Sequence, residues 1–176
     1  TIAGDKAFDW QKEFPQVFEK GGFDIIIGNP PYVKEYTSRS AFEGLHNHPC
    51  YQGKMDLWYF FGNLAIEISK KEIGLIGFIA PSNWITNAGA SIFRNIIIEH
   101  AKILQYIDFG DFKVFEDAGI QTMIYIMQHT QNNLRYNIPY SRILDSNVDS
   151  NDVSDFLNKV VSPKFVYFES ILENIN

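Results

Sequence analysis

Residues 23–32 read FDIIIGNPPY, and this stretch decides the fold. Its first half is a short β-branched run bounded by glycine, which is typical of a strand buried on both faces of a parallel sheet. Pro30 and Pro31 then stop the pattern, because each proline has a fixed φ and lacks the N–H that helices and sheets need. We therefore expect the chain to turn out of the sheet at Asn29.

Strand and helix patterns alternate in the residues that follow this turn. Apolar side chains recur at helical spacing over residues 56–71 and 89–100, which predicts two helices. Residues 74–81 form a second strand pattern that also ends in proline, and residues 104–109 and 122–128 predict two more strands. This order predicts an α/β fold whose sheet is mostly parallel, with the last two strands as an antiparallel edge.

Two polar regions interrupt this pattern. Residues 33–53 form a segment that is too long for a structureless loop inside a compact domain, so we expect either a functional flap or a partly disordered segment there. Residues 1–22 predict a short helix or an irregular lead-in that ends at two glycines. Residues 145–155 are rich in Ser, Asn and Asp, and we expect a linker there.

Composition excludes several classes of protein. The chain has 176 residues, of which 45% are hydrophobic, so disorder of the whole chain is excluded. A net charge of −6 excludes a generally cationic nucleic-acid coat protein. The single cysteine excludes an intramolecular disulfide and fits a cytoplasmic location. No apolar run approaches the roughly 18 residues of a membrane span, so we expect no membrane partner.

The turn at residues 29–32 has the groups needed to activate a ring amine. An exocyclic amine on a heteroaromatic ring is a poor nucleophile, because its lone pair is delocalised into the ring. The side-chain carbonyl of Asn29 and the backbone carbonyl of Pro30 could each accept one N–H and so expose that lone pair. Tyr32 offers a flat face on which a base can stack, which contributes roughly 1–3 kcal/mol per base.

Four blocks of the sequence resemble the motifs of one enzyme family in the correct order. Residues 23–32 resemble the catalytic motif of the DNA adenine-N6 methyltransferases, above all the γ class of restriction-modification systems. Residues 54–61, 74–84 and 107–118 resemble the motifs that follow it. The resemblance covers about residues 8–128. It implies a Rossmann-like sheet that binds S-adenosylmethionine as methyl donor.

The resemblance also implies roles for individual residues. Asn29 and Pro30 would hold the N6 amine of an adenine flipped out of double-stranded DNA, with Pro31 as a further substrate contact. Tyr32 would stack on the base and Phe115 would lie on its other face. The methyl group would pass directly from donor to amine, so neither a metal nor a covalent intermediate is expected.

One feature of the family is absent from the chain. The family binds its donor through a glycine-rich strand-to-helix loop and an acidic residue after the next strand, both upstream of the catalytic motif, and residues 1–22 contain neither of these two elements. We therefore interpret residues 1–130 as the C-terminal half of a catalytic domain whose donor-binding half is missing. Residues 131–176 would be a linker or the start of a target-recognition region. Alone, the chain is expected to bind the donor poorly and to be inactive, with the remainder of the polypeptide as its partner.

Several residues have a structural interpretation beside the functional one. Asp56 could contact the donor or merely cap the helix that follows it. Phe115 could stack on a base or belong to the core. Lys34 and Arg39, together with Lys54, could bind DNA phosphates or form an ordinary solvated loop.

A metal site is not expected in this sequence. Residues 46–50, HNHPC, contain three candidate ligands but lack a fourth at familiar spacing. Asn83 and Trp84 follow a strand end, as site residues do, but Trp84 could simply pack the loop.

Two alternative functions remain open at this point. Methyltransferases that act on glutamine side chains of proteins use a similar Asn-Pro-Pro-Tyr motif to hold an amide nitrogen. A catalytically silent DNA-recognition subunit could also keep the fold without the chemistry. The long flap and the region around Phe115 favour a flipped base as substrate.

Overall fold

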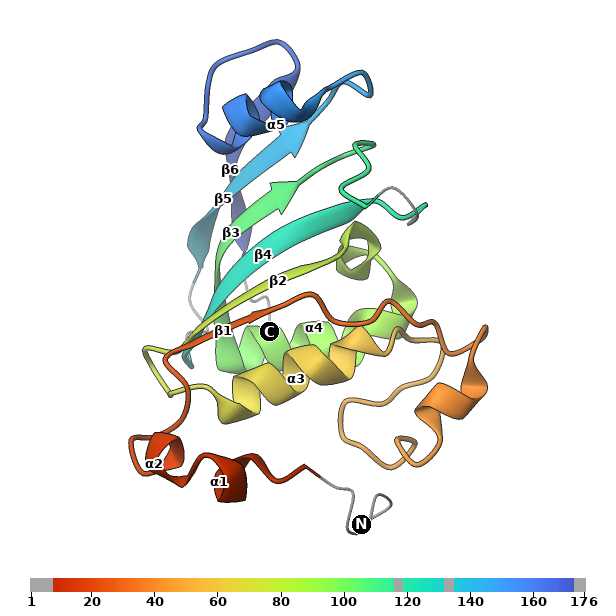
Figure 1. Cartoon of the computed structure of the whole chain (residues 1–176), viewed down its shortest axis with the longest axis vertical. Helices are drawn as coiled ribbons and strands as arrows, with labels where there is room; N and C mark the ends of the chain where they lie inside the picture. The colour runs from red at the N-terminus through yellow and green to blue at the C-terminus, as the bar shows by residue number, and fades with distance from the viewer. Residues whose placement is uncertain (1–7, 116–118, 132–134, 173–176) are drawn as a thin grey trace.

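A computed structural model describes residues 8–115, 119–131 and 135–172, and its centre is a six-stranded sheet (Figure 1). The strands lie in the order β1-β2-β4-β3-β5-β6. Their bounds are β1 (Ile25–Gly28), β2 (Leu75–Pro81), β3 (Ala101–Asp108), β4 (Thr122–His129), β5 (Tyr136–Ile143) and β6 (Phe165–Leu172). Strands β1, β2, β3 and β5 run in one direction, and β4 and β6 run in the other. The prediction of a mostly parallel α/β sheet is confirmed.

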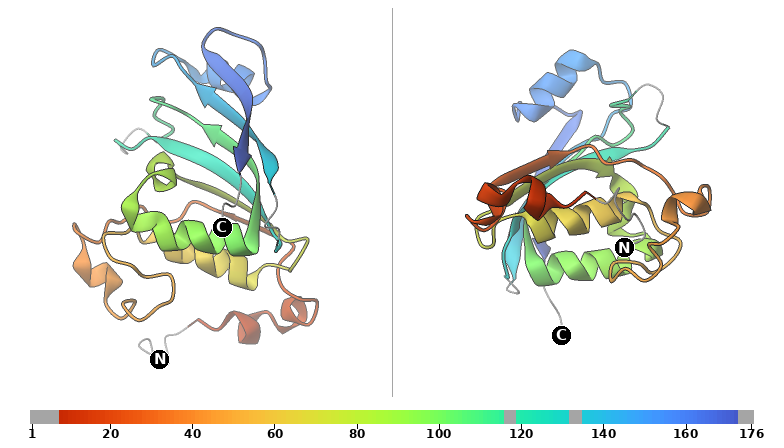
Figure 2. Two further views of the ribbon diagram at one scale, coloured as in Figure 1. Left: turned by 180° about the vertical axis from the view of Figure 1, so that it is seen from behind. Right: turned by 60° about the horizontal axis from the view of Figure 1, so that its bottom comes forward.

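Two helices cover one face of this sheet. Figures 1 and 2 show α3 (Trp58–Ile68) and α4 (Ser91–His100) side by side against it, while α5 (Ser150–Leu157) lies beside the far strands. The remaining helices are short and lie in the connections: α1 (Trp10–Glu13), α2 (Pro15–Phe18), η2 (Arg39–Phe42), η3 (Ser82–Ile85) and η4 (Ala88–Ala90). None of the described helices combines the length and the apolarity that crossing a bilayer requires.

The core follows from the alternation of side chains along the central strands. Successive residues of a strand point to opposite faces, so Ile76 and Phe78 of β2 and Tyr125 of β4 all face the helices and are buried. Ile79 and Ile124 point to the other face, where they pack against a second cluster that contains Phe156 of α5. The main core therefore lies between the sheet and helices α3 and α4, and the second cluster lies on the opposite face of the sheet.

Strand β1 lies at one edge of the sheet and pairs with β2 in parallel. Ile26 packs against the main core, but Ile25 and Ile27 remain 61% and 84% exposed. The expectation that this strand is buried on both faces is wrong for the described structure, because none of the described elements covers the face that carries Ile25 and Ile27.

The last two predicted strands do pair antiparallel, but they do not form the edge of the sheet. Strand β4 lies between β2 and β3 and is antiparallel to both. The antiparallel edge strand is β6, which pairs with β5. Sequence spacing predicts the β3–β4 pair because the two strands are close in the chain. The position of β4 next to β2 depends instead on pairing between residues that are distant in the chain.

The region expected to be a linker contains regular structure. Strand β5 pairs in parallel with β3 and so extends the same sheet, and β6 pairs with β5. Asp149 begins α5 with a capping box, in which its side chain accepts hydrogen bonds from Asn151 and Asp152 backbone N–H groups. A polar composition over residues 145–155 therefore reflects a helix start as well as loops. The division of the chain after residue 130 stays a prediction.

Candidate active site

The turn after β1 leaves its polar groups available. Pro30 is buried and anchors the turn, whereas Asn29 is exposed and faces solvent. Among the described residues, no hydrogen bond engages the side-chain amide of Asn29 or the backbone carbonyl of Pro30. The next carbonyl along, that of Pro31, accepts a hydrogen bond from the Val33 N–H at 3.1 Å. Both predicted acceptors are thus present without an internal partner.

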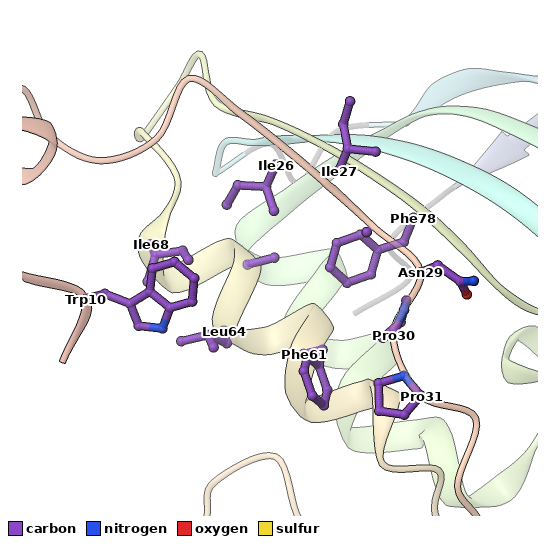
Figure 3. Close-up of a pocket in the computed structure, with 12 residues that line it drawn as sticks. Trp10, Ile26, Ile27, Asn29, Pro30, Pro31, Phe61, Leu64, Ile68 and Phe78 are labelled. Atoms are coloured by element: carbon purple, nitrogen blue, oxygen red, sulfur yellow. The ribbon is translucent and has the colours of Figure 1, made fainter. Parts of the chain in front are cut away.

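A cavity of about 300 Å³ lies between this turn and α3 (Figure 3). Its walls are almost entirely apolar, and Asn29 is the only polar side chain in its lining. The lining residues are Trp10, Ile26, Ile27, Gly28, Asn29, Pro30, Pro31, Phe61, Leu64, Ala65, Ile68 and Phe78. In Figure 3 the amide of Asn29 points away from Phe61 and Leu64, at the rim of the cavity.

Two lining residues escape sequence reasoning. Trp10 belongs to the lead-in, and Phe61 lies beside Phe60 on an apolar helix, where the default interpretation of both side chains is the core. Phe60 is buried, but Phe61 is 42% exposed and lines the cavity. The helical period separates the two neighbours by about 100° on α3, and this is the signal that distinguishes them.

The ring of Tyr32, at the end of the turn, lies near the ring of Phe115 from a distant part of the chain. Their ring centroids are 6.5 Å apart and their planes are inclined by 60°. At this separation and inclination the two rings lie near each other but are not parallel, so they do not form a stacked clamp in the described structure. Phe115 is half-buried, and it is its neighbour Val114 that packs against a core cluster. The geometry thus favours an exposed role for Phe115 over a core role.

The hydroxyl of Tyr32 fixes the orientation of its ring. It donates a hydrogen bond to the backbone carbonyl of Ile79 on β2 at 3.0 Å. Burial raises the pKa of Tyr32 to about 12, because the ionised phenolate would be poorly solvated. The side chain is therefore a neutral hydrogen-bond donor at neutral pH, and its aromatic face remains available.

Asp56 lies beneath the flap and does not line the cavity beside Asn29. It is 1% exposed, its Oδ2 accepts a hydrogen bond from the Tyr59 hydroxyl at 3.4 Å, and its Oδ1 has no partner among the described residues. Burial raises the pKa of Asp56, although the nearby cation of Lys34 opposes this effect. Leu57 occupies the N-cap position of α3, so the expectation that Asp56 caps the helix is wrong. A role of Asp56 toward the donor stays a prediction.

The flap is ordered and tied to the catalytic turn. The Glu35 N–H donates to the Met55 carbonyl at 3.0 Å, and the Leu57 N–H donates to the Val33 carbonyl at 2.8 Å. Lys34 is half-buried, with its ammonium 5.8 Å from the centre of the Tyr36 ring. The flap therefore leads away from Tyr32 as two paired segments.

Arg39 lies further along the flap, at the start of η2. Both Arg39 and Lys54 line a hollow in the flap, so the structure brings these two predicted cations together. The loop after β2 has a different character, since Asn83 is exposed but Trp84 is 2% exposed and packs in the core.

The residues 46–50 have a structural explanation. The His48 Nδ1 accepts a hydrogen bond from the Cys50 N–H at 3.1 Å, and the Cys50 thiol lies 3.7 Å from the Tyr59 carbonyl, to which it donates. Burial raises the pKa of the Cys50 thiol to about 12, so it is a poor nucleophile and a poor metal ligand. In the described part of the chain, no group of three or more candidate ligands could hold a metal ion.

Comparison with known proteins gives a consistent result. The model of the Eco57I restriction-modification methylase family matches residues 1–115. The chain is 28% identical over 117 residues to the type II methyltransferase M.BanIII of Aneurinibacillus aneurinilyticus, covering 66% of this chain and 20% of that protein. It is 25% identical over 120 residues to the type II restriction enzyme and methyltransferase RM.Eco57I of Escherichia coli, covering 65% of this chain and 12% of that protein.

Solved structures show the same fold. The type IIG restriction endonuclease BpuSI aligns with a TM-score of 0.56 at 15% identity, over 86% of this chain and 19% of the BpuSI chain. The chain thus spans a fifth or less of the length of these relatives. Its sheet and helices are those of a methyltransferase fold, and its catalytic turn lies within the matched residues.

Proposed function

Because this chain belongs to the Eco57I restriction-modification methylase family, we propose that it carries the catalytic turn of a site-specific DNA methyltransferase acting on the N6 amine of adenine. One observation carries the proposal: the Asn29 amide and the Pro30 carbonyl have no internal partner among the described residues and lie at the rim of a cavity. Pro30 is buried, and buried backbone carbonyls are normally paired within the fold, so its unpaired carbonyl next to the exposed Asn29 amide suits a ligand.

The two acceptors would act on the amine itself. Each accepts one N–H, and together they draw the nitrogen toward tetrahedral geometry, so that its lone pair points away from the ring and can attack. This is positioning chemistry, and it works because a sheet and two prolines hold Asn29 and Pro30 rigidly before the substrate arrives. The nitrogen would bond to the methyl carbon while the carbon–sulfur bond of the donor breaks and its electron pair goes to sulfur, and one N6 proton would pass to solvent water.

The aromatic pair would hold the base in position. The N6 amine of a paired adenine cannot be reached inside the duplex, so the nucleotide has to leave the stack. Tyr32 and Phe115 lie 6.5 Å apart with planes inclined by 60°, and the Tyr32 ring is held by its hydrogen bond to the Ile79 carbonyl, so Phe115 would have to turn to stack on the other face of the adenine. Stacking on the protein would offset part of the free-energy cost of removing the base from its stacked and paired neighbours in the duplex.

The donor is the part of the reaction that this chain does not explain. S-adenosylmethionine, which the motif resemblance implies, would supply a methyl group on a sulfonium. It also carries a ribose, an amino group and a carboxylate, whereas the cavity beside Asn29 offers only one polar side chain. The described residues therefore do not fit the whole donor, and we propose that residues outside this chain hold its polar groups.

The partners follow from this division of tasks. We propose that the chain acts on double-stranded DNA as part of a longer polypeptide, which supplies the donor-binding half and a target-recognition domain. The sizes of the relatives support this, since the chain matches 20% of M.BanIII and 12% of RM.Eco57I. Residues 131–176 would form the approach to the recognition domain, and the chain alone would be inactive.

A direct test uses the complete gene product and a radiolabelled methyl donor. Duplex DNA and a glutamine-bearing protein substrate are offered in parallel, and the DNA is then hydrolysed to nucleosides. We expect label only in DNA, as N6-methyladenine. Label in glutamine would establish the alternative protein substrate, and a complete gene product that binds DNA without transferring label would establish the silent recognition subunit.

A further inference from the structure

Lys54 has an unusual backbone conformation for a lysine. Its φ is +52°, in the left-handed region, and it follows Gly53 with a φ of +82°. Residues other than glycine, asparagine and aspartate are disfavoured in the left-handed region, because their Cβ crowds the backbone. Strained residues of this kind persist only where their surroundings hold them, and they concentrate at functional sites.

The surroundings of Lys54 hold its backbone from two sides. A Cβ built on Gly89 would lie 2.0 Å from the Lys54 carbonyl oxygen, so the loop before α4 presses directly on this peptide. The Gln52 side chain donates to the Ala88 carbonyl at 2.6 Å and accepts from the Ile92 N–H at 2.6 Å. On the other side, Met55 pairs with Glu35 through its carbonyl.

The lysine side chain has no packing role that explains its presence. It is exposed, while the backbone position would suit glycine better. The side chain faces a hollow of about 600 Å³ whose other lining residues are Glu35, Tyr36, Arg39, His46 and Gly53. The backbone of Lys54 is therefore held in place at the wall of the hollow, and its exposed side chain shares this hollow with Arg39.

The charges in the hollow favour an anion. Lys54 and Arg39 are cations, and Glu35 is the only carboxylate in the lining. The Glu35 carboxylate accepts a hydrogen bond from the Tyr51 hydroxyl at 2.5 Å, which lowers its pKa and partly satisfies its charge. The hollow is thus locally cationic in a chain whose net charge is −6.

We propose that this hollow is a preorganised site for a backbone phosphate of DNA, built around Lys54 and Arg39. The inference rests on the proposed function, and it adds a specific contact to it. The flap follows Tyr32 directly in the chain, and the ammonium of Lys34 lies 5.8 Å from the centre of the Tyr36 ring, which lines the hollow. A strand whose adenine is held at Tyr32 would therefore pass the flap, where a cationic hollow can bind one of its phosphates.

The experiment compares two lysines with the same strained backbone. Lys159 also has a left-handed φ, +58°, and is exposed, but it follows α5 and lies outside the flap. Lys54→Gly and Lys159→Gly each remove one cation and one strained φ. Both variants of the complete gene product are titrated with fluorescein-labelled duplex DNA by anisotropy between 50 and 200 mM KCl, and their thermal midpoints are measured.

Lys54→Gly should raise the Kd for DNA on the order of 3- to 10-fold at 50 mM salt and reduce the slope of log K against log salt by about 0.9. Its Tm should stay level or rise, because glycine adopts this φ without strain. Lys159→Gly should show the same Tm behaviour with unchanged Kd and slope. If Lys54→Gly is lost to misfolding, Lys54→Gln, which keeps a side chain of similar length, should give the same loss of affinity and slope.

The outcomes separate the two proposals. If the Kd and salt slope of Lys54→Gly or Lys54→Gln equal those of Lys159→Gly, the hollow binds no phosphate, while transfer to adenine by the unaltered protein leaves the proposed function intact. If the unaltered protein is folded but neither binds nor methylates DNA, the proposed function and the phosphate site fail together.

Discussion

Strands β1 and β2 are parallel neighbours with a proline at or just after their ends, Pro30 two residues after β1 and Pro81 as the last residue of β2, yet the residues that follow have opposite surroundings. After β1, Asn29 is exposed at the rim of a cavity. After β2, Trp84 is 2% exposed and packs against Trp58 and Phe93. The Arg94 guanidinium also donates to the Trp84 carbonyl at 2.7 Å, so backbone acceptors of this second loop are satisfied.

The difference between these two loops indicates which of them is the candidate site of the reaction. A proline-terminated strand gives a rigid turn at either position, so rigidity alone does not mark a site. The loop after β2 uses its groups to hold the fold together, whereas the turn after β1 leaves two acceptors for a ligand. Substitutions after β2 should therefore change stability, and substitutions after β1 should change activity.

The largest expected effect on stability is that of Trp84→Ala. Removing this buried side chain leaves a cavity among Trp58, Phe93 and Tyr125, which costs about 3–5 kcal/mol. Urea unfolding followed by circular dichroism measures the loss. Ile85→Ala is the control from the same loop, and since Ile85 is 39% exposed it should cost clearly less. Equal losses for the two variants would remove the contrast between the loops.

Tyr32→Ala should have a smaller free-energy effect, and it should appear in activity. Loss of the stacking face costs roughly 1–3 kcal/mol, which corresponds to about 5- to 160-fold in kcat/KM. Tyr32→Phe keeps the ring and loses only the hydrogen bond to the Ile79 carbonyl, so most activity should remain. Steady-state methylation of duplex DNA by the complete gene product measures both. If Tyr32→Phe were as impaired as Tyr32→Ala, the hydroxyl rather than the ring would be the working group.

The smallest expected effect is a pH-dependent change in stability caused by Asp56. Its folded-state pKa is raised above the ordinary 3.8, so the folded protein binds more protons than the unfolded chain between these two pKa values. Stability therefore falls as pH rises through that window, and the cost persists at neutral pH. Asp56→Asn should raise the Tm at pH 7.5, and its advantage should disappear below the ordinary pKa.

An exposed aspartate provides the control for this titration. Asp155→Asn changes the same functional group on the outer side of α5, where solvent surrounds the carboxylate. At pH 7.5 its Tm should stay close to that of the unaltered protein. A Tm of Asp56→Asn that equals that of the unaltered protein from pH 3 to pH 8 would contradict the assigned burial penalty.

Local sequence signals predicted the parts of the fold that depend on neighbouring residues. The β-branched runs and prolines placed the ends of β1 and β2, and helical spacing placed α3 and α4. The position of β4 between β2 and β3 was missed, because pairing such as Phe78 with Tyr125 joins residues far apart in the chain. The helix α5 had a local signal in the Asp149 capping box, but the surrounding Ser and Asn residues favoured a linker instead.

The candidate site likewise contains some features that the sequence could predict and others that it could not. The turn from Asn29 to Tyr32 could be predicted, because prolines act on their own backbone and its neighbours. The approach of Phe115 to Tyr32, the exposure of Phe61 and the strain at Lys54 could not, since each depends on how separate elements pack. The wrong N-cap assignment for Asp56 has the same cause, because pairing of Lys34 with Asp56 draws that side chain under the flap.

The measurement that tests the central claim most directly is methyl transfer by Asn29→Ala in the complete gene product, with Asn95→Ala on the exposed face of α4 as control. DNA affinity and Tm are measured on the same preparations. Asn29→Ala should lower transfer by on the order of 100- to 1,000-fold while DNA affinity and Tm stay level, because one of the two acceptors is lost and nothing in the fold depends on it. Asn95→Ala should behave like the unaltered protein. Unchanged transfer by Asn29→Ala would contradict the account.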